Sequence, residues 1–251
     1  MSDEAPIQLE VRNRVLIITL DRPHALNAHN QAMRDQLVDA LDRLDTEDEL
    51  LVGVIRGAGR AFSAGADLKE LTGNPASDRP DVDRATRMRP FVRLDATRKP
   101  LIAVVHGWTI AGGFELALCC DIRVAAADAQ FALPEPRSIS SVAGVAVLRL
   151  ANMIPLGEAM RLLLTSQPID AARAHAIGLV QEVAADADAA LDVALQLAAQ
   201  IVECDADAVA NAKQIARWPL NRDVAVSGRF AVEVGAFGPL GTQQFGPAPS
   251  P

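Results

Sequence analysis

Three apolar runs constrain the fold of this chain most strongly. They read LLVGVIRG (50–57), LIAVVHG (101–107) and IRVAAA (122–127), and each contains a single Arg or His among its apolar residues. Runs of this kind are typical of strands buried on both faces, which occur in parallel sheets covered by helices. The sequence therefore predicts an α/β domain built around a buried parallel sheet.

The segments around these runs fit the same plan. Residues 7–20 predict two short strands joined by a turn near 12–14, and residues 112–120 predict a helix after two glycines. After about residue 142 the pattern is mainly helical, with one strand expected at 179–183, and the Gly/Pro-rich tail from Gly235 is expected to form loops. A helix is expected from about Asn30, because Met33, Leu37, Leu41 and Leu44 follow helical spacing.

Composition excludes several classes of protein. A net charge of −8 over 251 residues argues against a nucleic-acid binder that neutralises phosphates. The sequence contains no run of about 18 apolar residues, so we expect no membrane-spanning helix. The opening MSDEAPIQLE resembles neither a signal nor a transit peptide. The three cysteines lack metal-ligand spacing. We therefore expect a cytoplasmic protein without a metal site and with no nucleic-acid or membrane partner.

One candidate site follows the first apolar run, in RGAGRAFSAGADLKEL (56–71). Ala64, Gly65 and Ala66 are small enough to let a ligand approach backbone N–H groups, and Asp67 could cap the next turn. A dinucleotide fingerprint fails here because Phe62 stands at its third glycine position. The alternative is a tight strand-to-helix turn that binds nothing.

A second candidate is HGWTIAGGFELALCCD (106–121). Gly112 and Gly113 precede helical periodicity, and a helix N-terminus presents unpaired N–H groups with a partial positive charge. Two such sites facing each other would form an oxyanion hole for a carbonyl oxygen. Glu115 lies in the first turn of this helix, where the alternative is a carboxylate that only stabilises the helix.

The third candidate is AQFALPEPRSISS (129–141), in which Glu135 stands between Pro134 and Pro136. The prolines restrict the backbone and would hold this carboxylate on a stiff loop. An exposed loop glutamate is the alternative. All three candidates follow buried strands, at the sheet edge where open α/β folds bind their ligands.

Four stretches resemble the crotonase superfamily, also called the enoyl-CoA hydratase/isomerase family. The similarity covers about residues 7–220. It implies a crotonase (ClpP/crotonase-like) fold of the α/β class, with a spiral core of stacked ββα turns and a helical C-terminal region that mediates trimerisation. The matching stretches are DRPHALNA (21–28), AFSAGADLKEL (61–71), KPLIAVVHGWTIAGGFELALCCDIRVAAADAQFALPEP (99–136) and LGEAMRLLLTSQPIDAARAHAIGLVQEV (156–183).

The resemblance also implies a division of the chain and an assembly. Residues 1–195 would form the spiral core with the acyl-CoA site, and residues 196–251 the C-terminal helical region with its Gly/Pro-rich tail. The partners implied are an acyl-CoA thioester and further copies of the chain, in a homotrimer or a dimer of trimers. No cofactor is implied, since coenzyme A is part of the substrate.

Site residues follow from the matching positions. The resemblance implies that the backbone N–H groups of Ala66 and Gly112 polarise the thioester carbonyl. It also implies that Glu115 and Glu135 hold a water molecule and exchange protons with the substrate. The implied contacts to the acyl-CoA substrate come from Arg22, Ala25, Leu26, Ala64, Gly65, Asp67, Leu68 and Gly113, and Arg22 is either a phosphate ligand or a solvated loop charge.

Two departures from the family keep other functions open. A glycine-rich stretch usually follows the second glutamate, but residues 137–150 read RSISSVAGVAVLRL, with side chains that would reshape the acyl pocket. The family's charged C-terminal helix is replaced by VGAFGPLGTQQFGPAPSP (234–251). Enoyl-CoA hydration, a lyase reaction of fatty-acid or related acyl-CoA metabolism, is the expected activity. The alternatives are an isomerase, an acyl-CoA hydrolase, a decarboxylase or a non-catalytic acyl-CoA-binding homologue.

Overall fold

The computed structural model describes residues 5–71, 84–138 and 144–217. Within these residues a six-stranded sheet forms the centre of the fold, in the order β1-β2-β3-β5-β7-β10. Its strands confirm the predicted parallel sheet of apolar runs. An antiparallel hairpin of β1 (Ile7–Arg12) and β2 (Val15–Leu20) is continued in parallel by β3 (Val52–Gly57), β5 (Leu101–Val105), β7 (Ile122–Ala126) and β10 (Glu182–Ala184).

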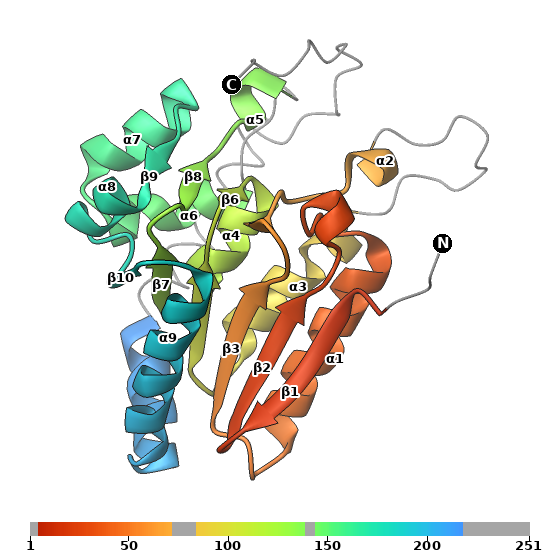
Figure 1. Cartoon of the computed structure of the whole chain (residues 1–251), viewed down its shortest axis with the longest axis vertical. Helices are drawn as coiled ribbons and strands as arrows, with labels where there is room; N and C mark the ends of the chain where they lie inside the picture. The colour runs from red at the N-terminus through yellow and green to blue at the C-terminus, as the bar shows by residue number, and fades with distance from the viewer. Residues whose placement is uncertain (1–4, 72–83, 139–143, 218–251) are drawn as a thin grey trace.

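Both faces of this sheet are buried along its central strands β2, β3, β5 and β7. On β2, Leu16 and Ile18 belong to one hydrophobic cluster, whereas Val15 and Ile17 belong to the other. This division follows from the two-residue period of a strand, which points successive side chains to opposite faces. Figure 1 shows the helices that cover them: α1 (Gln31–Thr46) and α3 (Arg84–Ala96) lie on one face and α9 (Ala187–Val202) on the other.

The start of α1 was predicted correctly. Asn30 is its N-cap residue, and its side chain accepts a hydrogen bond of 2.9 Å from the Met33 amide. Leu37, Leu41 and Leu44 are buried along one side of the helix, as their spacing indicated. The segment just before Asn30 is thereby fixed at the edge of the sheet.

A second, four-stranded sheet lies at one end of the first within the described residues, and the sequence patterns did not predict it. Its order is β4 (Ala61–Ser63), β6 (Trp108–Ile110), β8 (Gln130–Ala132) and β9 (Ile169–Asp170). Strands of two or three residues are too short to show a periodicity. β4, β6 and β8 are parallel, so their carboxyl ends meet at one edge. Each of the three candidate segments contains one of these strands and continues from its carboxyl end.

The other described helices follow in chain order. They are η1 (Pro23–Ala25), α2 (Leu68–Leu71), α4 (Gly112–Cys119), α5 (Glu135–Ser138), α6 (Gly144–Met153), α7 (Leu156–Thr165), α8 (Ala171–Ala176) and a helix over residues 206–217. The largely helical second half is thereby confirmed, and Figure 1 places α2 and α5 at the same end of the molecule. Among the described residues, no helix is long and apolar enough to cross a bilayer.

One boundary differs from the sequence prediction. The strand expected at 179–183 is instead β10, because Leu179 and Val180 bury their side chains in the core as the chain leaves α8. Residue 195, where we placed the end of the spiral core, lies inside α9, and the division of the chain there stays a prediction. Residues 139–143, which belong to the stretch that departs from the family, and the tail from Gly235 lie outside the described residues.

Candidate active site

Two loops from distant parts of the sequence meet at Gly65 and Gly112. A Cβ atom on Gly65 would lie 2.7 Å from the Gly112 amide nitrogen, and one on Gly112 would lie 3.6 Å from the Ala66 amide nitrogen. Gly65 also has a φ of +85°, which side chains rarely adopt. The structure thus brings the predicted amides of Ala66 and Gly112 side by side, and the glycines are what permit this approach.

The Ala66 amide faces away from its neighbouring chain segment. His29 donates a 2.7 Å hydrogen bond from its backbone N–H to the Gly65 carbonyl, and its own carbonyl accepts one of 3.2 Å from Asp67. In such a parallel bridge the residue between the two bonded positions directs its own N–H to the other side. The Ala66 N–H therefore points away from His29 and donates to no group in the part of the chain described.

The Gly112 amide has no hydrogen-bond partner among the described residues for a different reason. Gly112 is the first residue of α4, where backbone N–H groups have no partner within the helix. Ala111 just before it has φ 52° and ψ −129°, a strained conformation for alanine, which turns the chain sharply from β6 into the helix. Gly113 packs so tightly that a Cβ atom there would lie 2.4 Å from the Ser63 carbonyl oxygen.

Glu115 is buried in α4 and fixed by the start of α6. Its Oε1 accepts hydrogen bonds of 2.7 Å from the Val145 amide and 3.2 Å from the Ala146 amide. Burial raises the pKa of the Glu115 carboxyl to about 7, although these two hydrogen bonds act in the opposite direction. Glu115 is only 8% exposed, so this carboxyl in the first turn of α4 is buried. Its catalytic role stays a prediction, beside the alternative of a carboxylate that only stabilises the helix.

Glu135 is also buried rather than displayed on an exposed loop. It is the first residue of α5, and its Oε2 is inaccessible and has no hydrogen-bond partner among the described residues. Burial raises the pKa of this carboxyl to about 7. A hydrogen bond from its own backbone N–H lowers the pKa, and the charge of Glu115 raises it. An orphaned buried carboxyl oxygen is costly unless a water molecule or a substrate contacts it.

The two carboxyl groups can act as an acid–base pair. Neither forms an ion pair with a Lys, Arg or His within the described ranges. Their pKa values of about 7 leave one able to hold a proton while the other is ionised at neutral pH. Together with the amides of Ala66 and Gly112, these groups have the chemistry needed to polarise a carbonyl and to move protons.

The expected substrate-binding residues come from three segments near this pair of amides: 22–26, 64–68 and the start of α4. Leu26, which follows η1, accepts a 2.9 Å hydrogen bond from Ala64, so the two loops lie side by side. Ala25 and Asp67 are half-buried, and Leu68 is 53% exposed at the start of α2. Nothing in the structure tests whether they contact coenzyme A, and that role stays a prediction.

Arg22 is not a solvated loop charge. Its Nη1 lies 2.9 Å from Asp67 Oδ2 and donates a 2.6 Å hydrogen bond to the Ala28 carbonyl, and its side chain is 17% exposed. The guanidinium therefore ties the first loop to the residue after Ala66. Its contact with a phosphate stays a prediction.

Sequence reasoning missed a polar cluster beneath residues 64–67, which carry the predicted donor Ala66 and are called the proposed oxyanion loop below. It consists of Asn27, His29 and Ser63, all buried, and Asn27 Nδ2 donates to the carbonyls of Ala58 and Ala61, each at 2.8 Å. The Val145 and Ala146 amides that hold Glu115 were missed as well. The only signal in the sequence was the unusual concentration of polar residues in NAHN (27–30) within an otherwise buried region.

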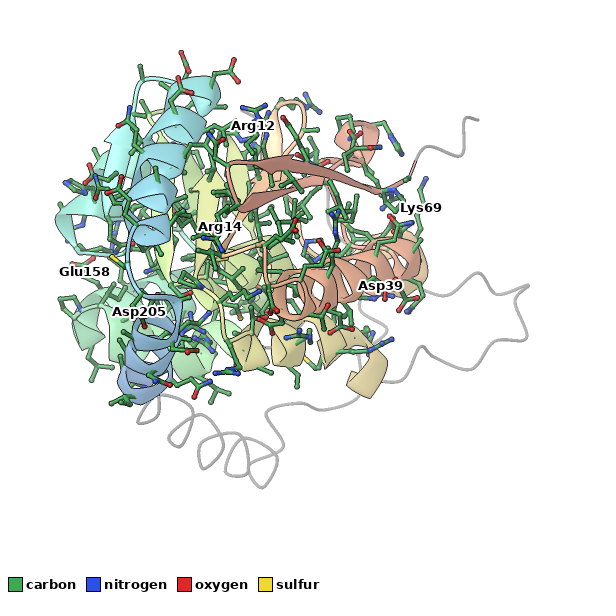
Figure 2. The ribbon with its side chains drawn as sticks, turned by 90° about the horizontal axis from the view of Figure 1, so that it is seen from below. Arg12, Arg14, Asp39, Lys69, Glu158 and Asp205 are labelled. Carbon is green, nitrogen blue, oxygen red and sulfur yellow. The ribbon has the colours of Figure 1, made fainter. Side chains whose placement is uncertain are left out.

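Other features of the described chain lack this chemistry. A hollow of about 380 Å³ beside α7 and α8 is lined by Arg161, Asp170 and Arg173. Asp170 caps α8 there, and Arg173 pairs with Glu158. Figure 2 shows Glu158 at the opposite side of the molecule from Lys69, which follows the proposed oxyanion loop on α2. No cluster of three metal-ligating side chains occurs in the described ranges.

Comparison with known proteins identifies the family of this chain. The family model described as enoyl-CoA hydratase/isomerase matches residues 10–240. The chain belongs to the enoyl-CoA hydratase/isomerase family. A 2,3-dehydroadipyl-CoA hydratase from Escherichia coli is 39% identical over 223 residues, covering 88% of this chain and 85% of that protein. A short-chain-enoyl-CoA hydratase from Clostridium acetobutylicum is 32% identical, covering 92% and 87%.

Solved structures of the family share the fold. The enoyl-CoA hydratase EchA1 from Mycobacterium marinum superposes with a TM-score of 0.78 at 39% identity, covering 92% of this chain and 90% of that one. A monofunctional enoyl-CoA isomerase from M. smegmatis gives a TM-score of 0.74 at 26% identity, covering 86% and 94%. The crotonase fold is thereby confirmed, and the family includes both reaction types.

Proposed function

We propose that this chain is an enoyl-CoA hydratase, which adds water across the double bond of a 2-trans-enoyl-CoA. The observation that supports it best is the pair of buried carboxyl groups, Glu115 and Glu135, each without an ion pair in the described chain and each with a pKa raised to about 7. An isomerase needs only one group to shuttle a proton, whereas activation and delivery of water employ two.

The amides of Ala66 and Gly112 would bind the thioester oxygen. As water adds to the β-carbon, negative charge develops on this oxygen, and two fixed N–H dipoles stabilise it more strongly than they stabilise the ground state. Gly112 adds the positive end of α4 to this field. A single donor of this type typically contributes about 100- to 1000-fold in rate.

The glutamates would handle the protons. The ionised carboxylate accepts a proton from water as the water oxygen bonds to the β-carbon, and the protonated carboxyl gives its proton to the α-carbon. One group gains the proton that the other loses, so the total charge of the pair does not change. Passage of a proton from the first group back to the second through solvent restores the starting state. Glu115 is oriented by the Val145 and Ala146 amides, which leaves its second oxygen for water.

This reaction requires no cofactor beyond the coenzyme A of its substrate. We also propose a homotrimer or a dimer of trimers as the assembly. One feature in favour is an apolar stripe on α7, where Leu156, Met160 and Leu164 are 59%, 45% and 73% exposed at four-residue spacing. Light scattering of the purified protein tests this, and a monomer would contradict it.

The test of the function compares three single variants. Glu115→Gln and Glu135→Gln keep the shape of each side chain but remove its proton chemistry, and we expect each to lower kcat by about 100- to 10,000-fold. Glu182→Gln, on the exposed β10, is the matched control and should retain wild-type turnover. Loss of the conjugated thioester absorbance of a 2-trans-enoyl-CoA follows the reaction.

The same assay separates hydration from isomerisation. Supplied with a 3-enoyl-CoA, an isomerase would form the conjugated 2-enoyl-CoA, and mass spectrometry would show no gain of water. If the folded protein bound acyl-CoA but catalysed only that conversion, the hydratase proposal would be wrong. Wild-type turnover by both Gln variants would exclude the two-glutamate mechanism.

A further inference from the structure

His29 lies beneath the proposed oxyanion loop, in contact with both sides of the proposed donor Ala66. It is 7% exposed and directly precedes the N-cap of α1. Its backbone bonds to Gly65 and Asp67, on either side of Ala66, and its carbonyl also accepts a 2.8 Å hydrogen bond from Arg34. The rigid start of α1 is thus coupled to the loop through one residue.

The imidazole of His29 makes a second connection through Ser63. Ser63 Oγ lies 2.9 Å from His29 Nε2, 2.9 Å from the Asn27 carbonyl oxygen and 3.1 Å from the Gly65 amide nitrogen. A hydroxyl has one proton and two lone pairs. The Asn27 carbonyl can only accept, so it takes the proton, and the lone pairs accept from the Gly65 N–H and from His29.

This arrangement assigns the tautomer and excludes a nucleophilic serine. His29 must carry its proton on Nε2 in order to donate to Ser63. Burial, together with the nearby charges of Arg34 and Arg22, lowers the pKa of His29 to about 4, so the ring is neutral at neutral pH. The Ser63 side chain is fully buried and its proton is committed to a backbone carbonyl, so it cannot attack a thioester.

We propose that His29 is a positioning residue for the oxyanion hole. Its backbone holds Gly65 and Asp67, and its Nε2–H holds the Ser63 hydroxyl that fixes the Gly65 amide, so the turn aims the Ala66 N–H at the thioester oxygen. This inference rests on the proposed function, because the donor matters only if a thioester carbonyl binds there. His29 thus holds the loop at two points, through its backbone and through its side chain, which leaves the Ala66 peptide little freedom to rotate.

The experiment measures polarisation of a bound thioester separately from turnover. The probe is 4-dimethylaminocinnamoyl-CoA, whose absorbance maximum moves to longer wavelength when hydrogen bonds withdraw charge onto its carbonyl oxygen. His29→Leu removes the N–H donor, Ser63→Ala removes the hydroxyl, and His29→Gln replaces the ring by an amide that can still donate an N–H. On binding to the wild-type protein, the absorbance maximum of the probe should move strongly to longer wavelength.

We expect His29→Leu and Ser63→Ala to reduce that shift and to lower kcat by roughly 10- to 100-fold, since misplacing a donor costs about this much. KM for a 2-trans-enoyl-CoA should change by no more than about threefold, because ground-state binding is largely kept. His29→Gln should restore most of the spectral shift and most of kcat. His106→Leu is the matched control: His106 is equally buried but bonds to the Gly59 carbonyl, and its loss should leave the shift unchanged.

The outcomes separate this inference from the proposed function. If wild type binds the probe without any spectral shift, the oxyanion hole and the inference fail together. If wild type shifts the probe and both His29→Leu and Ser63→Ala shift it equally, with unchanged kcat, only the role of His29 is overturned. Equal defects in His29→Gln and His29→Leu would also overturn it. Should His29→Leu not fold, Ser63→Ala decides alone, since it removes a single oxygen atom.

Discussion

Gly65 and Gly112 approach so closely that a methyl group on Gly65 would press on the amide nitrogen of Gly112, 2.7 Å away. Each of the two residues lies two positions beyond the end of a strand of the small sheet, Gly65 after β4 and Gly112 after β6, and these parallel strands lie next to each other. Pairing of these strands sets the distance between the Ala66 and Gly112 amides. The position of the proposed oxyanion hole is therefore determined by the pairing of these strands rather than by either loop alone.

The first prediction concerns this approach. Gly65→Ala should lower kcat/KM by about 100-fold or more, because the new Cβ separates the two donors that act together. Steady-state kinetics on a 2-trans-enoyl-CoA measure the effect. Gly178→Ala is the matched control, since Gly178 has a similar φ of +78° but open space around it. It should lower thermal stability through backbone strain and leave kcat/KM unchanged. Equal kinetics for the two variants would contradict the prediction.

The second prediction is a bell-shaped dependence of kcat/KM on pH with its maximum near pH 7. Burial raises the pKa of both Glu115 and Glu135 to about 7, and the charge on Glu115 raises that of Glu135. The active form has one proton on the pair, and it is lost by protonation at low pH and by deprotonation at high pH. The two limbs belong to the pair and not to either residue. A flat profile from about pH 5 to 9 would exclude this coupling.

The third prediction is that Glu135→Gln stabilises the folded protein above neutral pH. The Glu135 pKa is about 7 when folded but near 4.5 when unfolded, so the unfolded chain ionises first as pH rises. Wild-type stability therefore falls between about pH 4.5 and 7 by up to about 3 kcal/mol through this group, and the loss persists above pH 7. Urea unfolding at pH 4 and pH 8 measures it. The variant should gain stability only at pH 8, and a gain independent of pH would point to a different cause.

The sequence predicted the parts of this molecule that local patterns specify. Apolar runs such as 101–107 were predicted as strands because burial on both faces leaves no polar positions. Glu115 stood out because a carboxylate follows two glycines inside an apolar helix. By contrast, β4 and β6 are three residues long and take their form only from each other. The strand near 180 was misplaced because Val180 is apolar for a different reason, burial beside α8.

Partners that are distant in the chain could not be predicted. His29 and Ser63 lie 34 residues apart, and each alone fits a loop or a strand end. Likewise, nothing local indicates that the Val145 and Ala146 amides hold Glu115. The family resemblance located both glutamates but not these contacts, because a motif names positions and the folded chain determines what touches them.

Two buried arginines contact the carboxyl-terminal end of α4. Arg217, in the helix over 206–217, donates a 2.7 Å hydrogen bond to the Cys119 carbonyl and pairs with Asp121 at 2.8 Å. Arg123 donates to the Cys120 carbonyl at 2.8 Å. Cations at this position satisfy unpaired carbonyls and oppose the negative end of the helix dipole. The helix over 206–217 therefore anchors α4 at the end opposite to Gly112 and Glu115.

The final prediction is that Arg217→Met destabilises the fold. It removes the donor to the Cys119 carbonyl and one of two cations on Asp121, whose other partner, Lys213 at 2.9 Å, remains. We expect a loss of about 2–3 kcal/mol, at the lower end for breaking a buried pair because Lys213 still compensates the charge. Urea unfolding measures it. Arg12→Met, which breaks the exposed pair with Glu10, is the control and should leave the midpoint unchanged. If both variants unfold at the wild-type midpoint, α4 is not anchored through Arg217.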